Sequence, residues 1–313
     1  MGRALVVLNA QAGMVRDVGA ARLRARLTHA LILPDLEVEV EIAEGEHLQG
    51  ILTSVVARGY DTLIVGAGDG TVSHASAVLC GTSVRLGILP LGTMNMLAHD
   101  IGLPRDLAQA LDALRLARPM RIDLATVNGR AFHGVSGLGF FTQMAMAREQ
   151  RRARHGRFAG WLLALARAVM RSGRLSLVIE IEGRRAPLEA YAAIITNNAF
   201  DTAGYHRSRL DAGILEIHVA EERGALARIR AGADLLAQSW RTNPAIHTFR
   251  ARAVTIHASH RRRAWVATDG EVSREVLPLH YEVAPRALSL LLPPGAPQWH
   301  RAKDQIQNAI RSE

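Results

Sequence analysis

The chain has 313 residues, which is enough for about two domains that each bury a core. Hydrophobic residues make up 49% and charged residues 21%, a composition typical of a globular protein and not of a disordered one. The net charge of +9 favours an anionic partner, but the aromatic content of 4% is low for base-stacking platforms, so we do not expect nucleic acid to be that partner.

The sequence also limits the compartment and the kind of membrane contact. Cys80 is the single cysteine, so it cannot form an internal disulfide, and a reducing cytoplasm fits. The apolar run over residues 4–8 is too short for a signal-peptide core, and no stretch approaches the roughly 18 apolar residues that span a bilayer. We therefore expect a cytoplasmic protein whose contact with the membrane is peripheral.

Three units of strand, polar loop and helix are predicted in the first third of the chain. Strand-like runs cover residues 4–8, 62–65 and 86–89, and each leads into a loop rich in glycine or asparagine. Such a succession indicates a parallel α/β sheet. Because ligands of open parallel sheets bind beyond the carboxyl ends of the strands, the three loops predict the site.

From about residue 121 the pattern changes to short strands with turn signals between them. The predicted strands cover residues 122–127, 175–181, 190–196, 214–219, 253–257, 279–283 and 287–292. This spacing indicates an antiparallel β-sandwich or barrel with helices over about 148–170 and 225–239. We expect an α/β domain over residues 1–120 and a β-sandwich domain over 121–295, with a last helix over 296–313 packing back on the first domain.

The loop Gly66-Ala67-Gly68-Asp69-Gly70-Thr71 carries the strongest chemical signal. Its small residues let the backbone approach a phosphate chain, and the amide groups of a helix start favour anionic oxygens. Thr71 can cap that helix or bind a phosphate oxygen. Asp69 would repel phosphate, so we expect it to face a metal ion or an accepting hydroxyl. The alternative is a tight strand-to-helix turn with an Asx cap.

Residues 65–103 resemble the nucleotide-binding core of the diacylglycerol kinase catalytic domain family. The resemblance rests on Gly68-Asp69-Gly70-Thr71 together with the block Leu89-Pro90-Leu91-Gly92-Thr93-Met94-Asn95. Further similarities extend it over nearly the whole chain, at Asn9-Ala10-Gln11-Ala12-Gly13, Ile122-Asp123-Leu124, Gly137-Leu138-Gly139-Phe140, Asn197-Asn198, Leu210-Asp211-Ala212-Gly213 and Asp269-Gly270-Glu271.

The resemblance implies two lobes with ATP and Mg²⁺ between them, and phosphoryl transfer to a lipid alcohol at an anionic membrane surface. It implies that Asp69 acts on metal or substrate and that Glu271 is the general base, which suits a weak alcohol nucleophile. Asp211 is a candidate ligand of a structural Mg²⁺. A homodimer is left open. The residues implied to contact the nucleotide are Asn9, Gly68, Gly70, Thr71, Gly92, Thr93 and Asn95.

Some positions depart from the family pattern. Ala10 and Ala12 stand in place of a proline and a serine, and Ala67 stands in place of a glycine. Ala212 replaces the second aspartate of a motif associated with a structural Mg²⁺, which puts that site in doubt. Asp269-Gly270 is also a common hairpin signal, so the tripeptide taken alone favours an exposed turn.

Two other functions are compatible with the motifs: a soluble kinase of the NAD kinase type, and a non-catalytic nucleotide sensor at a membrane. The block around Gly92 and the Asp-Gly-Glu motif argue against the first, and retention of Asp69 and Glu271 argues against the second. The predicted helix over residues 148–170 combines an arginine-rich start with an apolar stripe. It would either dock on an anionic membrane or face the core.

Overall fold

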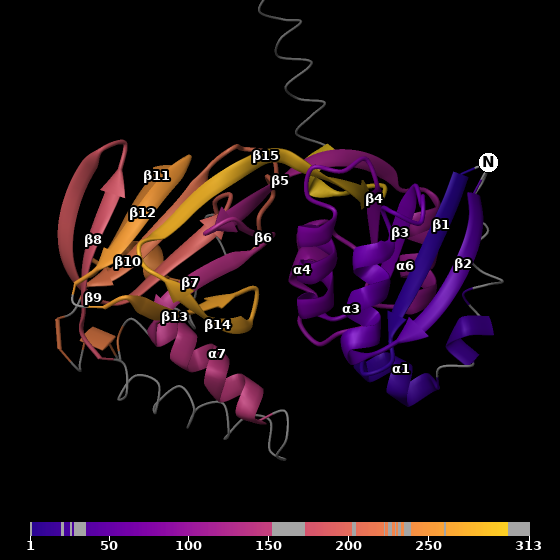
Figure 1. The fold of residues 1–313 in the computed structure, drawn as a ribbon, viewed down its shortest axis with the longest axis horizontal. Helices are drawn as coiled ribbons and strands as arrows, with labels where there is room; N and C mark the ends of the chain where they lie inside the picture. The colour runs from indigo at the N-terminus through magenta and orange to yellow at the C-terminus, as the bar shows by residue number, and fades with distance from the viewer. Residues whose placement is uncertain are drawn as a thin grey trace, which may run out of the picture. The chain divides into compact units, whose positions relative to one another are not determined.

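The computed structural model describes residues 2–19, 22–25, 27, 36–151, 173–201, 205–221, 223–224, 227–228, 230, 233–234, 239–259 and 261–299. They form two compact units (Figure 1). Unit 1 comprises the described residues up to Leu124, the segment His206–Ala212 and the described residues from Pro285 on; unit 2 comprises the rest. The sequence-based boundary at residue 120 lies near the first crossing. The return to unit 1 at Pro285 begins before the expected terminal helix at residue 296, and the return at His206–Ala212 was not anticipated.

Unit 1 is built on a parallel sheet. Its strand order is β2 (Leu36–Ala43), β1 (Gly2–Asn9), β3 (Thr62–Ala67), β4 (Arg85–Pro90) and the last part of β15 (Leu279–Leu292). Residues 4–8 of β1 are all completely buried, as expected for a strand covered on both faces. The three predicted strands are confirmed. The edge strand β2 was missed, although its sequence alternates glutamate with apolar residues.

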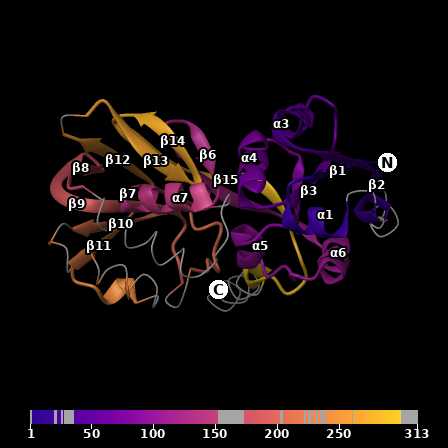
Figure 2. The ribbon, with the colours of Figure 1, turned by 90° about the horizontal axis from the view of Figure 1, so that it is seen from below.

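Helices cover both faces of this sheet. They are α1 (Gly13–Val18), α3 (Gly45–Ser54), α4 (Asp69–Val78), α5 (Met96–Asp100) and α6 (Leu107–Arg115). Leu107 and Leu111 of α6 pack in one cluster with Val6 and Leu8 of β1, while α3 and α4 lie on the other side of β1 and β3 (Figure 2). The loops after β1, β3 and β4 are thereby left at one edge of the sheet.

Unit 2 is an antiparallel β-structure, which confirms the predicted second fold class. Its main path runs β14 (Glu271–Val276), β13 (Arg263–Thr268), β7 (Val135–Gly139), β9 (Arg184–Asn197), β8 (Leu175–Ile181), β12 (Ala253–Ala258) and the first part of β15. β10 (Leu215–Glu221) pairs with β9 and β11 (Ile246–Ala251). β5 (Arg118–Val127), which enters unit 2 at Ala125, pairs with β15 and β6 (Arg130–Phe132). The predicted run 175–181 coincides with β8. The runs 279–283 and 287–292 are parts of one strand, β15.

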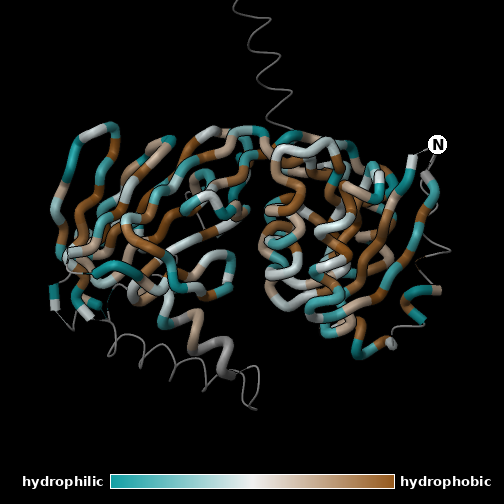
Figure 3. Tube along the Cα trace, viewed as in Figure 1, coloured by the Kyte–Doolittle hydropathy of each residue, from teal (hydrophilic) through white to brown (hydrophobic). Residues whose placement is uncertain are grey.

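Two further elements of unit 2 are α7 (Phe140–Arg151) and the short 3-10 helix η1 (Trp240–Thr242). Hydrophobic residues follow the strands of both units (Figure 3), and the core of unit 2 includes Phe132, Ile195 and Val266. Most of the predicted helix over 148–170, and residues 300–313 of the predicted terminal helix, lie outside the described residues. Among the described helices, none is long and apolar enough to cross a membrane.

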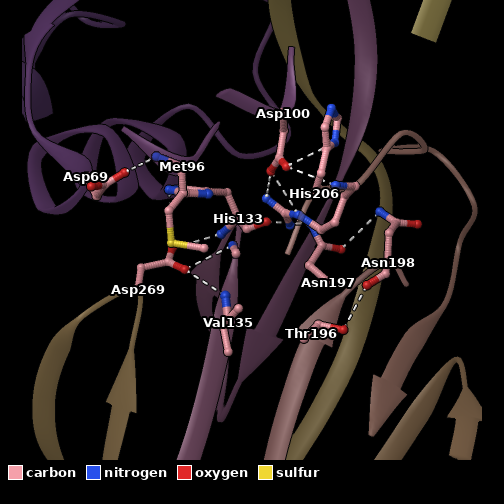
Figure 4. Close-up of polar contacts among 12 residues, drawn as sticks. Asp69, Met96, Asp100, His133, Val135, Thr196, Asn197, Asn198, His206 and Asp269 are labelled. Carbon is pink, nitrogen blue, oxygen red and sulfur yellow. Dashed lines mark hydrogen bonds and ion pairs between the residues drawn. The ribbon is translucent and has the colours of Figure 1, made fainter. Parts of the chain in front are cut away.

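A buried ion pair between Arg207 and Asp100 connects the segment His206–Ala212 to the rest of unit 1. Arg207 is completely buried, and its Nε and backbone N–H donate to the Asp100 carboxylate at 3.0 Å each. The side chain of Gln298 donates to the backbone oxygen of Asp100 at 3.0 Å. Three separate stretches of chain therefore meet at one polar cluster inside unit 1, and Figure 4 shows its contact between Asp100 and His206.

We predict that Arg207→Met destabilises unit 1 by about 3 to 5 kcal/mol, because it leaves the Asp100 charge buried without its guanidinium partner. Urea unfolding followed by circular dichroism measures the change. Arg209→Met is the matched control, since the Arg209 side chain is 44% exposed and its ion pair with Asp211 is long, at 3.7 Å. Equal unfolding of the two variants would contradict the structural role given to Arg207.

Candidate functional site

Three loops converge at the carboxyl ends of the parallel strands in unit 1, and we call them the three-loop site: residues 9–12, 67–71 and 91–96. Asn9 ends β1, and its side-chain N–H donates to Oγ1 of Thr71 at 3.1 Å. The Asn9 Oδ1 accepts the backbone N–H of Gln11 at 2.9 Å, which fixes the first turn of the loop. The first loop is thus tied to the glycine-rich loop, as the shared position at the sheet edge predicts.

The glycine-rich loop and the third loop touch backbone to backbone. A Cβ atom added to Gly92 would overlap the Cα atom of Gly68 and lie 2.7 Å from Oδ1 of Asn95. A Cβ atom added to Gly68 would lie 3.5 Å from the Cα atom of Gly92. Glycine at position 92 is therefore required by the close approach of the two loops.

Asn95 folds the third loop around its own side chain. It adopts the left-handed conformation, with φ of 50°, which asparagine tolerates better than most residues. Its Oδ1 accepts the Gly92 N–H at 3.0 Å, and its Nδ2 donates to the backbone oxygens of Pro90 and Gly92. Thr93, in the middle of this loop, is exposed.

Asp69 joins the glycine-rich loop to the start of α5. Its two carboxylate oxygens accept the backbone N–H groups of Asn95 at 3.0 Å and Met96 at 2.6 Å, and Figure 4 shows the second contact. Each carboxylate oxygen has a further lone pair for another partner. The metal or substrate role predicted for Asp69 stays a prediction, and the structure adds a positioning role that sequence reasoning missed.

The amino end of α4 supplies an anion-binding feature. The helix begins at Asp69, with Gly68 as its N-cap, so Thr71 lies inside the first turn and is not the cap that the sequence allowed. Gly68 has no side chain to satisfy the first N–H groups, and Asp69 directs its carboxylate to α5 instead. These backbone donors, together with the positive end of the helix dipole, suit a phosphate group.

In unit 2, Asp269 and Gly270 form the turn of the β13–β14 hairpin. Both have positive φ, 48° and 88°, and Thr268 pairs with Glu271, as in a two-residue type I′ turn. The tripeptide is therefore a hairpin turn, and the side chain of Glu271 is 56% exposed beside it. Arg130 donates to the Glu271 carboxylate at 2.9 Å.

The Asp269 side chain forms hydrogen bonds with the loop at residues 133–135, which lies outside its own hairpin. Its side chain is 2% exposed, and its oxygens accept the N–H groups of His133, Gly134 and Val135 at 2.9–3.0 Å (Figure 4). Asn197 binds the same loop, donating from its side chain to the His133 backbone oxygen at 3.1 Å. Only the family resemblance singled out Asp269 and Asn197. No sequence pattern indicated that both form hydrogen bonds with residues 133–135.

A second buried carboxylate in unit 2 is structural. Glu216 is completely buried and accepts hydrogen bonds from Arg241, Arg250 and His218. Burial alone would raise the pKa of Glu216, but the hydrogen bonds of His218 and Arg241 outweigh it and lower this pKa to about 2. The carboxylate also accepts the Phe200 N–H, so it fixes the chain after β9.

Asp211 lies on the segment His206–Ala212 of unit 1 and forms an ion pair with Arg209. Within the described part of the chain, no group of three or more His, Cys, Asp or Glu side chains is arranged to hold a metal ion. The structural Mg²⁺ at Asp211 stays a prediction. The structure thus gathers the predicted nucleotide residues in unit 1, and places Glu271 in unit 2.

The parallel α/β unit with its glycine-rich loop and the antiparallel β unit each match a family model. The diacylglycerol kinase catalytic domain model matches residues 3–127, and the YegS C-terminal NAD kinase beta sandwich-like domain model matches residues 135–292. The chain belongs to this family of YegS-like and diacylglycerol kinases.

Individual relatives agree with this assignment. A Pseudomonas aeruginosa protein named "Probable lipid kinase YegS-like" is 30% identical over 84% of this chain and 86% of its own length. A Mycobacterium tuberculosis protein named diacylglycerol kinase is 33% identical over 53% of this chain and 55% of its own. Against relatives from Synechocystis and Klebsiella pneumoniae, the match spans only 56% and 38% of the relative's length.

Solved structures from Bacillus anthracis str. Sterne share the fold. One has a TM-score of 0.73 at 21% identity, and a second, titled as a diacylglycerol kinase, has a TM-score of 0.67 at 18% identity. Each likeness covers 94% of this chain and 98% of the other. At these identities the likeness establishes the arrangement of the strands and helices.

We predict that Gly92→Ala lowers the free energy of unfolding by about 1 to 3 kcal/mol, because the added methyl group must push two loop backbones apart. Urea unfolding measures the change. Gly50→Ala is the control, since a Cβ atom at Gly50 in α3 meets nothing within 4 Å and alanine favours a helix. Wild-type stability of Gly92→Ala would contradict the close approach.

Proposed function

We propose that the protein is an ATP-dependent lipid kinase. It transfers the γ-phosphoryl group of ATP to a hydroxyl group of a membrane lipid, such as diacylglycerol or a sphingoid or ceramide-type lipid. The observation that carries the proposal is the three-loop site, in which the N-terminal N–H groups of α4 lie beside the Gly68–Gly92 contact. The printed names of the relatives, lipid kinase and diacylglycerol kinase, support the choice of substrate class.

In this proposal the nucleotide phosphates bind at the three-loop site. Gly68 and Gly70 let the phosphates approach the backbone, and Asn9, Thr71 and Thr93 offer side-chain hydrogen bonds. Asn95 and Gly92 contribute by holding the third loop in its fold. Because the loops are joined by hydrogen bonds before ATP arrives, little ordering is needed on binding.

Mg²⁺ fits the donors of this site. It prefers carboxylate oxygens together with substrate phosphates, and the Asp69 oxygens retain lone pairs beyond their backbone hydrogen bonds. When bound, Mg²⁺ neutralises the charge on the phosphates. Asp69 would hold it with the nucleotide, while Asp211 remains a separate candidate ligand for a structural ion.

Glu271 is the proposed general base. The lipid hydroxyl oxygen forms a bond to the γ-phosphorus, the bond between that phosphorus and the ADP oxygen breaks, and the hydroxyl proton passes to Glu271. The 56% exposure of its side chain supports this role, and Arg130 donates one hydrogen bond to the carboxylate. The lipid is reached at the inner face of the membrane, to which the protein binds peripherally.

We predict that Asp69→Asn and Glu271→Gln each reduce kcat by at least about a hundredfold, because each removes a charge that the transfer requires. Radiolabelled ATP with a total lipid extract, followed by product chromatography, measures turnover and identifies the lipid. A parallel tube with NAD tests the soluble-kinase alternative, and a protein that binds ATP without forming either product would be a sensor.

Two control variants separate catalysis from folding. Glu275→Gln changes another carboxylate of β14, and this one accepts a hydrogen bond from Ser273. Asp106→Asn changes the N-cap of α6. Like Asp69, Asp106 accepts a backbone N–H at a helix start, but it lies outside the three-loop site. Both controls should turn over like wild type. Turnover near wild type in Asp69→Asn or Glu271→Gln would remove that residue from the mechanism.

We also predict that activity requires Mg²⁺ supplied with ATP, because the phosphate charge must be neutralised during transfer. Excess chelator should abolish product formation, and added Mg²⁺ should restore it. Circular dichroism in chelator serves as the control for unfolding. Full turnover in chelator would refute the requirement.

A further inference from the structure

The β13–β14 hairpin exposes the outer part of one of its faces, whereas Ala267 on that same face is completely buried. Val266 of β13 is completely buried and Thr268 is 2% exposed, so residues of the other parity must lie on the opposite face. Directly paired residues share a face, which places Trp265 with Arg274 there. The same rule places Arg263 with Val276 beside them. We call this surface the hairpin face.

Large apolar side chains on the hairpin face are exposed. Trp265 is 51% exposed and Val276 is 55% exposed. The two are diagonal neighbours across the strand pair, at a separation that their side chains can bridge. Single exposed apolar residues are ordinary, but this tryptophan and valine lie next to each other and form a small exposed apolar patch.

The charges around this apolar pair are positive. Arg263 and Arg274 are exposed on the hairpin face itself, and Arg261 and Arg262 are exposed immediately before β13. The carboxylates of the hairpin strands have the opposite parity and lie on the other face. They are also engaged, since Glu271 accepts from Arg130 and Glu275 accepts from Ser273.

Helix α7 fixes the hairpin face in place. Thr142 of α7 donates to the backbone oxygen of Trp265 at 3.2 Å. A Cβ atom added to Gly137 of the neighbouring strand β7 would lie 2.8 Å from the Phe141 ring, so α7 covers the β7 side of the surface. The hairpin is therefore held by a helix on one side and by the core below, and Figure 1 shows α7 beside β13 and β14.

We propose that the hairpin face is a docking surface for an anionic phospholipid bilayer. Trp265 would lie at the headgroup level, where tryptophan is favoured, and the four arginines would contact lipid phosphates. A second copy of the chain is a poorer occupant, because face-to-face pairing would bring the arginines together. The inference rests on the proposed lipid kinase function and adds the surface that brings the enzyme to its substrate.

If the hairpin face docks on a bilayer, its arginines and Trp265 should contribute to vesicle binding in ways that salt can distinguish. Each surface arginine contributes about fivefold to binding of an anionic membrane, so Arg263→Gln with Arg274→Gln should weaken binding about twenty-fivefold. This loss should shrink at high salt, because the attraction is screened. Trp265→Ala should weaken binding at both salt concentrations, and Trp265→Phe should reduce the quenching of tryptophan fluorescence by brominated lipids.

The experiment sediments the full chain with vesicles of phosphatidylglycerol and phosphatidylcholine. Arg184→Gln with Arg185→Gln is the matched control, since these exposed arginines lie on β9, away from the hairpin, and remove the same charge. Arg263→Lys with Arg274→Lys should retain binding. The proposal is overturned if the Gln pair at 263 and 274 binds vesicles like wild type, or if the control pair weakens binding equally.

Two further measurements separate this proposal from its alternatives and from the function on which it rests. Light scattering that shows a wild-type dimer and a monomeric Trp265→Ala variant, with vesicle binding unchanged, would assign the face to a second copy and overturn bilayer docking. Turnover of a short-chain, monomeric diacylglycerol should be equal in wild type and variants. Vesicle docking by a wild-type protein that phosphorylates no lipid would refute the kinase while leaving the docking surface supported.

Discussion

The Asp69 carboxylate joins the glycine-rich loop to the start of α5. Both α4 and α5 begin at the sheet edge, and the N–H groups at each helix start carry partial positive charge. Asp69 belongs to the first turn of α4 and accepts the N–H groups at the start of α5, so one negative charge lies between two positive ends. The glycine-rich loop can therefore contain a carboxylate without losing the N–H donors of its own helix.

Asp269 is the corresponding acceptor of backbone N–H groups in unit 2. The loop at residues 133–135 directs three N–H groups to one point, and a buried cluster of donors needs an anionic acceptor. The aspartate that fills it comes from a hairpin far away in the sequence. Asp69 and Asp269 therefore both accept backbone N–H groups. The residue two positions further along each motif, Thr71 or Glu271, carries a second polar side chain.

The sequence predicted those parts of the fold that depend on local patterns. Residues 175–181 alternate and end at Glu182-Gly183, and they form β8. The loops after β1, β3 and β4 were located because each follows an apolar run. The sequence did not predict that 279–283 and 287–292 are one strand, since Pro285 between them reads as a break.

Contacts between distant segments could not be predicted in the same way. Arg207 and Asp100 are 107 positions apart, and an arginine and an aspartate have no local signal that distinguishes a buried pair from two solvated charges. The return of the segment His206–Ala212 to unit 1 depends on such contacts, including the Asp123 N–H, which donates to the Leu210 oxygen. Family resemblance marked Asp211 for a metal, but it gave no indication that the neighbouring Arg207 anchors the segment.

The two acidic residues of the Asp-Gly-Glu motif differ in a way that bears on their roles. Asp269 is 2% exposed and its oxygens accept three backbone N–H groups, so a lipid hydroxyl cannot reach it without breaking the turn. Glu271 is 56% exposed and is held by one guanidinium group. Because positive φ at both turn residues fixes the direction of β14, the buried aspartate determines where the exposed glutamate points. The positioning by Asp269 and the proton transfer proposed for Glu271 thus both depend on one hairpin.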